Sequence, residues 1–179
     1  MFILAVLIQI LVAIGVNCQP GCNSELFLGN SCSHGQNKTT IMWYFDSTLS
    51  FCYPYQFLGC DEGPNSFKSQ DQCLESCKPA DQFSCGGNTD ADGVCFSPLD
   101  QSCKKGATCV MGGTVGFCCD KIIQDQWNEE HSPKCQSGSV AQIEQWFGKT
   151  PLIGRNCSHN FCPTGSRCIQ QKWTAHCCV

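Results

Sequence analysis

Cysteine constrains the fold of this chain more than any other feature, because 19 of its 179 residues are cysteine. Without the first 18 residues, 161 residues remain with 18 cysteines, about 11 percent, which is the composition of a disulfide scaffold. Apart from cysteine, about a quarter of those 161 residues are hydrophobic, which is thin for one conventional core. Disulfides, each worth roughly 2–4 kcal/mol, must therefore supply much of the stability. This composition argues against a single cytosolic enzyme domain.

The first 18 residues carry no charged side chain, and only Gln9 and Gly15 interrupt the apolar run from Phe2 to Val16. This run is shorter than the roughly 20 residues of a membrane span and is typical of a secretory signal peptide. We predict a signal peptide over residues 1–18, because cleavage after Cys18 leaves an even number of cysteines. The alternatives are cleavage after Gly15 and an uncleaved signal anchor. The mature protein is expected to be secreted and extracellular, where disulfides form, with no membrane segment after cleavage.

The remaining cysteines fall into three sets of six, which predict three modules. The first set is Cys22, Cys32, Cys52, Cys60, Cys73 and Cys77; the second is Cys85, Cys95, Cys103, Cys109, Cys118 and Cys119; the third is Cys135, Cys157, Cys162, Cys168, Cys177 and Cys178. Residues 121–134 are polar, contain a Ser-Pro break and predict a linker, with Trp127 and two isoleucines available for packing. The expected division is a first module at 19–78, a second at 79–120 and a third at 135–179.

The second and third sets are internal repeats. Both follow the pattern C-x2-G-x2-C-x8-C-C, once from Cys103 to Cys119 and once from Cys162 to Cys178. We expect Gly106 and Gly165 to adopt a positive φ that lets the chain fold back tightly. The third set also carries Val140, Ile143, Trp146 and Phe147, whose spacing predicts one short amphipathic helix ending at Gly148.

The first module has an α+β pattern. Two aromatic runs, residues 41–46 and 51–57, flank a polar turn and predict a twisted β-hairpin. Pro54 lies inside the second run, so we expect it where no ladder donor is needed. Ser69 followed by Gln72 forms a capping box that opens a short helix, in which Cys73 and Cys77 share one face.

The spacing Cys52-x7-Cys60-x12-Cys73-x3-Cys77, together with Phe57-Leu58-Gly59-Cys60, Asn65 and Phe67, resembles the Kunitz family of serine protease inhibitors. The resemblance implies the disulfides Cys22–Cys77, Cys32–Cys60 and Cys52–Cys73. The two later modules resemble the lustrin-type cysteine-rich repeat of invertebrate secreted proteins, and we expect them to have little regular structure. Their pairing stays open, since six cysteines allow 15 connectivities. We expect the neighbours in each double cysteine to pair with different partners.

The Kunitz resemblance also implies a reactive loop that binds a protease as a substrate does. The residues that it implies are Asn30, Ser31, Cys32, Ser33, His34 and Gly59, with Ser33 directed into the S1 pocket and Gly59 supporting the loop. Serine is too short for the deep pocket of trypsin, so we expect a shallow, elastase-like pocket instead. The segment after Ser33 is about four residues longer than in the family, and Leu58 stands where the family usually has glycine. Asn37 and Asn156 begin N-glycosylation sequons.

Other kinds of chemistry find less support in the residues. No C-x2-C pair occurs, and His34, His131, His159 and His176 do not fall at zinc-finger spacing, so we expect disulfides, no metal and no cofactor. No nucleophile, base and orienting group stand out, which argues against an enzyme. The net charge of −4 is mild and argues against a nucleic-acid partner. The expected partner is an extracellular serine protease. The alternative is a non-inhibitory protein that binds extracellular matrix proteins and uses the Kunitz fold as a scaffold.

Overall fold

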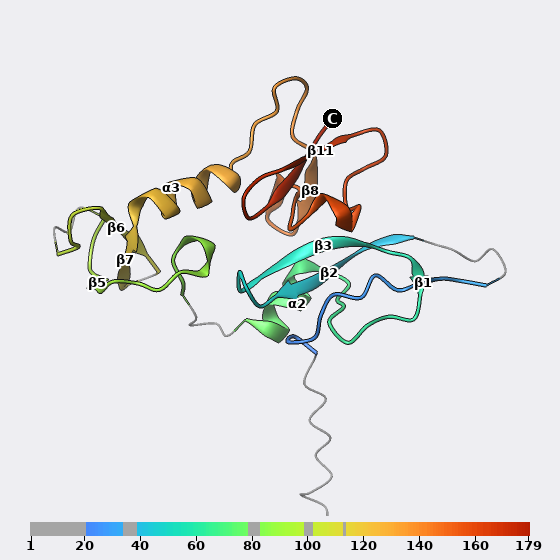
Figure 1. The fold of residues 1–179 in the computed structure, drawn as a ribbon, viewed down its shortest axis with the longest axis horizontal. Helices are drawn as coiled ribbons and strands as arrows, with labels where there is room; N and C mark the ends of the chain where they lie inside the picture. The colour runs from blue at the N-terminus through green and yellow to red at the C-terminus, as the bar shows by residue number, and fades with distance from the viewer. Residues whose placement is uncertain (1–20, 34–38, 79–82, 99–101, 113) are drawn as a thin grey trace, which may run out of the picture.

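A computed structural model describes residues 21–33, 39–78, 83–98, 102–112 and 114–179. The first module contains β1 (Asn30–Ser31), β2 (Thr40–Asp46), β3 (Phe51–Phe57), β4 (Gly59–Cys60) and α2 (Gln70–Cys77). Strands β2 and β3 form the predicted hairpin, in register from Thr40 opposite Phe57 to Asp46 opposite Phe51. Helix α2 lies against one side of this hairpin (Figure 1), so the first module has the α+β architecture expected from its sequence.

Local chemistry explains why the hairpin accepts a proline. Pro54 lies opposite Trp43 in the β2–β3 register. The Trp43 N–H and carbonyl are turned away from β3, because both hydrogen-bond to the backbone of Phe67 at 2.8 Å. The pair Trp43 and Pro54 is therefore a non-hydrogen-bonded pair, where proline's missing N–H costs nothing.

Helix α2 begins where the capping box predicts. The Ser69 hydroxyl accepts a hydrogen bond from the Gln72 N–H at 3.1 Å. The Gln72 side chain reaches back one residue further than expected and accepts from the Lys68 N–H at 3.0 Å. Cys73 is fully buried under the hairpin, where it is bonded to Cys52.

The second and third modules have the same small fold. Each contains a three-stranded antiparallel sheet with its last strand in the centre, in the orders β5-β7-β6 and β10-β12-β11. The strands are β5 (Val94–Cys95), β6 (Ala107–Met111), β7 (Gly116–Asp120), β10 (Ile153–Gly154), β11 (Arg167–Gln170) and β12 (Ala175–Cys178). In the second module the 3₁₀ turn η1 (Gly86–Asn88) precedes the sheet. In the third module the 3₁₀ turn η2 (Cys157–His159) lies between β10 and β11. Gly106 and Gly165 have φ values of +91° and +85°, as the repeat pattern predicts.

The disulfides follow the three sets of cysteines. In the first module the bridges are Cys22–Cys77, Cys32–Cys60 and Cys52–Cys73, which are the pairs that the resemblance implies. In the second they are Cys85–Cys119, Cys95–Cys109 and Cys103–Cys118. In the third they are Cys135–Cys178, Cys157–Cys168 and Cys162–Cys177. Both repeats thus join the first cysteine of their set to the sixth, the second to the fourth and the third to the fifth. The neighbours in each double cysteine have different partners, as expected.

The structure differs from the sequence-based expectation at two elements. Residues expected to be a linker form α3 (Lys121–Glu130), whose first turn is capped by the Asp120 carboxylate accepting from the Ile123 N–H at 3.0 Å. The prediction of a helix around Ile143 is wrong. That segment is a hairpin of β8 (Gln142–Gln145) and β9 (Gly148–Pro151), with Trp146 and Phe147 at its two-residue tip. Gly148, with a φ of +132°, permits the reversal, and both aromatic rings remain exposed instead of completing an apolar helix face.

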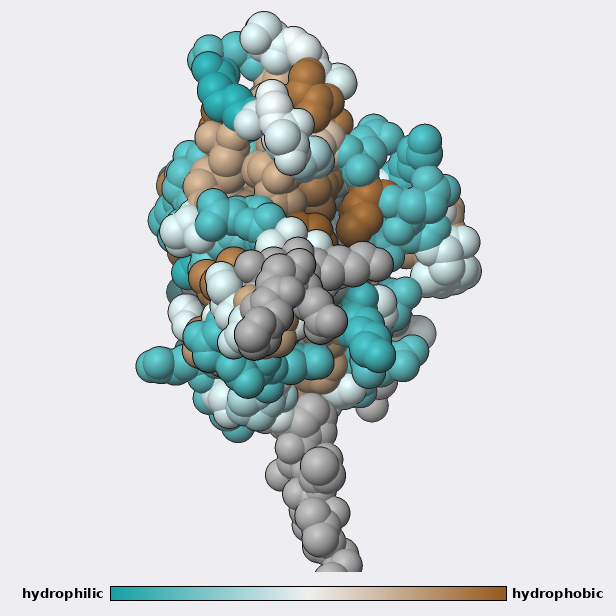
Figure 2. Space-filling view, turned by 90° about the vertical axis from the view of Figure 1, so that its right-hand side faces the viewer, coloured by the Kyte–Doolittle hydropathy of each residue, from teal (hydrophilic) through white to brown (hydrophobic). Residues whose placement is uncertain are grey.

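The surface is unevenly apolar. Figure 2 views the end of the molecule that carries β1, and it shows hydrophilic residues over most of the first module, below. Apolar residues gather in the upper part of that view, over the third module. Among the described residues, no helix is both long and apolar enough to cross a membrane.

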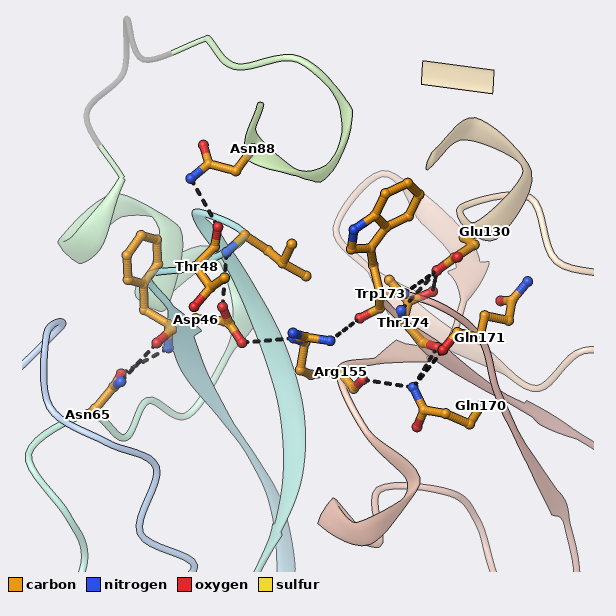
Figure 3. Close-up of polar contacts among 12 residues, drawn as sticks. Asp46, Thr48, Asn65, Asn88, Glu130, Arg155, Gln170, Gln171, Trp173 and Thr174 are labelled. Carbon is orange, nitrogen blue, oxygen red and sulfur yellow. Dashed lines mark hydrogen bonds and ion pairs between the residues drawn. The ribbon is translucent and has the colours of Figure 1, made fainter. Parts of the chain in front are cut away.

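The three modules pack against one another. Trp127 of α3 and Trp173 of the third module both pack on the aromatic core of the β2–β3 hairpin, with their rings 5.9 Å apart. Polar contacts surround this junction (Figure 3): Arg155 Nε donates to the Asp46 carboxylate at 2.9 Å, and Asn88 Nδ2 donates to the Thr48 carbonyl at 3.0 Å. The second and third modules therefore both rest on the turn end of the first module's hairpin.

Candidate functional site

The loop at residues 30–33 lies at one end of the first module, where strand pairing and a disulfide hold its base. Strand β1 pairs with β4, which places Asn30 opposite Cys60 and Ser31 opposite Gly59. The Cys32–Cys60 disulfide closes the loop directly beyond this pairing. Asn30 Nδ2 also donates to the Asp61 carboxylate at 2.8 Å. Asn30, Ser31 and Ser33 are exposed while their backbone is tied down, which is the geometry a substrate-like segment needs.

Two glycines make this close pairing possible. Gly59 has a φ of +115°, and Gly29, which precedes β1, has a φ of +81°. A Cβ atom at Gly29 would lie 2.4 Å from the Phe57 ring and 2.6 Å from the Cys60 carbonyl oxygen. Glycine is therefore required at Gly29 both for its conformation and for its space. Sequence reasoning expected the supporting role of Gly59 but missed Gly29, although its place three residues before Cys32 was a usable signal.

Further contacts fix the base of the loop to the rest of the first module. The Leu58 N–H donates to the Leu28 carbonyl at 2.9 Å, and the Leu58 side chain is half-buried. Asn65 is buried: its amide group accepts from the Phe45 N–H at 2.9 Å and donates to the Ser24 and Phe45 carbonyls. It thereby ties the segment before the loop to the hairpin.

Tyr55 of β3 is fully buried in the hairpin core of the first module. Tyr55 lies opposite Met42 in the hairpin, and its hydroxyl is hydrogen-bonded to Ser66. Burial raises the pKa of the Tyr55 phenol, an effect that the Ser66 hydrogen bond partly offsets. The phenol therefore stays neutral across the physiological pH range.

Two of the predicted loop and glycan residues, His34 and Asn37, lie outside the described residues. Ser33 is exposed at the last described position of the loop and presents only a hydroxyl group. Asn156, the second sequon, is exposed and precedes the bridged Cys157; its side-chain oxygen accepts from the Ser158 N–H at 2.9 Å.

Two groups of potential metal ligands come close together in the described part of the chain. These are Cys95, Cys103 and Cys118, and Cys135, His176 and Cys178. All five of these cysteines are in disulfides, and the sulfur that binds metals well is a thiolate. These two groups of residues are therefore better explained as disulfide cross-links than as sites for a metal ion.

The sequence is similar to known proteins along its whole length. Residues 21–78 match the Kunitz/bovine pancreatic trypsin inhibitor domain family. The chain is 65% identical over 178 residues to a BPTI/Kunitz inhibitor domain-containing protein of Caenorhabditis elegans, covering 99% of both chains. It is 26% identical over 183 residues to the major allergen Ani s 1 of Anisakis simplex, covering 97% of this chain and 94% of that one. It is 30% identical to chelonianin of Caretta caretta over 88 residues, 48% of this chain and 79% of that one. No solved structure matches it.

Proposed function

Because the chain belongs to the family of BPTI/Kunitz inhibitor domain-containing proteins, we propose that it is a secreted inhibitor of serine endopeptidases. The observation that carries the proposal is the exposed segment from Asn30 to Ser33, clamped by the β1–β4 pairing and the Cys32–Cys60 bridge. The partner would be an extracellular serine protease that binds this segment in its substrate cleft.

The mechanism follows from the rigidity of the segment. Immobilising a flexible side chain or loop on binding costs about 0.5–1.5 kcal/mol for each rotamer-rich side chain, so a segment whose base is already held in place loses less. The bridge also keeps both sides of the loop attached to the molecule if the bond after Ser33 is cut. Such a loop binds as a substrate does but separates slowly from the protease.

Ser33 determines the class of protease in this proposal. A serine side chain is small and uncharged, so it leaves the buried carboxylate of a trypsin-like S1 pocket without a partner. A shallow pocket of the elastase type accepts it without that cost. We therefore propose an elastase-like target and not trypsin.

The rest of the chain belongs to the same proposal. The signal peptide at residues 1–18, the division at 78, 120 and 134, and glycans on Asn37 and Asn156 are proposed from the sequence. The two repeats are proposed to be of the lustrin type, and their shared disulfide order supports a common origin for both.

A second candidate function is a non-inhibitory protein that binds extracellular matrix proteins. The observation in its favour is the pair Trp146 and Phe147, which are 84% and 63% exposed at the tip of the β8–β9 hairpin. Exposed aromatic side chains are common anchors of protein interfaces. In this alternative the first module serves as a scaffold, and Ser33 makes no contact with a protease.

The test is inhibition of trypsin, chymotrypsin and pancreatic elastase by the full oxidised chain, with and without enzymatic removal of glycans. The variants are Ser33→Lys and, as a matched control, Ser137→Lys, which changes an exposed serine of the third module. We expect the native chain to inhibit elastase, and only Ser33→Lys to inhibit trypsin. If the native chain and Ser33→Lys are both inert, the inhibitor proposal is wrong and the matrix-binding alternative replaces it.

A further inference from the structure

A groove of about 430 Å³ lies between the first and third modules, on the side of the hairpin where β2 begins. One wall comes from Ile41 and Gln56, which are paired across β2 and β3. The other wall comes from Ile143, Leu152, Phe161 and Pro163 of the third module. Half of the lining residues are apolar and half are polar, and the apolar Ile41 is 41% exposed.

The groove lies beside the loop at residues 30–33. Gln56 lines the groove, and Gly59, only three residues further along the chain, pairs with Ser31. Three extended residues span about 10 Å. Figure 2 faces this end of the molecule and shows the apolar surface of the third module above it.

The groove has a preformed shape. Phe161 and Leu152 are 1% and 6% exposed, and they form one core cluster with Ala141, Ala175 and Cys177. The Cys162–Cys177 bridge anchors the rim next to Pro163. The ion pair of Arg155 with Asp46 joins the third module to the turn end of the same hairpin (Figure 3). Because these side chains are already ordered, little conformational entropy is lost when a partner binds in the groove.

We propose that this groove is a second contact surface for the serine protease that the loop binds, and that it takes an apolar side chain from a surface loop of that protease. The proposal rests on the proposed function. A protease–inhibitor interface buries about 800 Å² on each partner, which corresponds to a disc about 16 Å in radius. Ser33 lies two residues beyond the base of the loop, so the groove begins within about 17 Å of Ser33, at the edge of a protease interface centred there. The groove supplies the apolar contact that Ser33 itself lacks.

The repeat relationship provides a variant that changes the groove and keeps the fold. Pro163 and Thr164 form the exposed turn between Cys162 and Gly165, and Lys104 and Lys105 form the equivalent turn between Cys103 and Gly106. The double substitution Pro163→Lys and Thr164→Lys gives the third module a turn that the second already uses. It places two charges on the apolar rim. The matched control is the reverse exchange, Lys104→Pro and Lys105→Thr, in the second module.

The experiment measures inhibition constants of the full oxidised chain for pancreatic elastase, and of its Ser33→Lys form for trypsin. We expect the Pro163→Lys, Thr164→Lys exchange to weaken inhibition at least tenfold, mainly through faster dissociation, and the reverse exchange to change it less than twofold. Hydrogen exchange of the Phe161, Cys162 and Thr164 amides should also slow when the protease is bound.

Two outcomes overturn the inference, and they differ from each other. If inhibition is intact, the rim exchange has no effect and the Phe161, Cys162 and Thr164 amides gain no protection, then the protease does not cover the groove and the proposed function stands. If neither the native chain nor Ser33→Lys inhibits any of the proteases, then the proposed function fails and the groove loses its occupant with it.

Discussion

At the scale of single residues, Arg155 connects two modules through one side chain. Its Nε donates to the Asp46 carboxylate at 2.9 Å, and its Nη1 donates to the Trp173 carbonyl at 2.6 Å (Figure 3). The two charged side chains are only 27% and 14% exposed. We predict that Arg155→Met lowers the free energy of unfolding by about 2 kcal/mol, because a partly buried carboxylate loses its partner. Thermal unfolding of the oxidised chain measures this as a Tm about 4–8 °C lower.

The control for Arg155 is Arg167→Met, which removes an exposed arginine of β11. Exposed substitutions of this kind change stability by about 0.5 kcal/mol or less. Equal losses in the two variants would show that the Arg155 contacts contribute nothing specific. The partners of Arg155 lie 109 and 18 residues away along the chain, which is why sequence reasoning did not single it out.

At the scale of elements, α3 supports the third module through its last residue. Glu130 is 6% exposed, and its carboxylate accepts hydrogen bonds from the backbone N–H groups of Lys172, Trp173 and Thr174 and from the Thr174 hydroxyl. We predict that Glu130→Gln lowers the free energy of unfolding by about 2 kcal/mol, because an amide turns an N–H group toward these donors and gives up the charge. A lower midpoint in guanidinium chloride unfolding measures it.

The adjacent Glu129→Gln makes the same chemical change at an exposed position of α3 and should leave the midpoint nearly unchanged. A loss of similar size at both positions would mean that the net charge of the helix matters and the buried contacts do not. The comparison therefore separates the contacts of Glu130 from its charge.

The elements also show where sequence reasoning succeeds. The β2–β3 hairpin, the start of α2 and the turn glycines Gly106 and Gly165 depend on neighbouring residues, so local patterns predict them. The β8–β9 hairpin does not, because a short apolar run with Ile143 and Trp146 fits a helix and a strand equally well. Its conformation depends on packing of Ile143 against two clusters of buried residues, one in the first module and one in the third module. The helix at 121–130 was missed for a similar reason, since its buried Glu130 has all its partners in the third module.

At the scale of the whole molecule, three histidines in separate places become buried or half-buried on folding. His131 follows α3, His159 lies edge-on to the Tyr44 ring, and His176 lies in β12; each has one buried ring nitrogen without a partner among the described residues. Burial lowers the pKa of all three imidazoles below the ordinary 6.5. The unfolded chain then binds more protons than the folded one, so stability is lost as the pH falls below 6.5. We predict a lower Tm at pH 5.0 than at pH 7.5.

The variant His159→Phe keeps a ring against Tyr44 and removes one of the titrating groups. We expect it to reduce the difference in Tm between the two pH values, although Arg155 and Asp46 near this ring act in opposite directions on its pKa. A native chain whose Tm does not change, or rises, on acidification would contradict the assignment of lowered pKa values to these three histidines.

The arrangement of the disulfides has a consequence for how the chain reaches its native state. Every bridge among the described cysteines stays within its own set of six, and the closest pair is only 11 residues apart. Eighteen cysteines can pair in roughly 34 million ways, whereas three independent sets of six can pair in about 3,400. Because domains fold as units, N-terminal first during synthesis, each set can close before the next one has emerged. Each set of six cysteines can therefore find its native pairing independently. A mispaired disulfide in one set can be rearranged without breaking the disulfides of the other two.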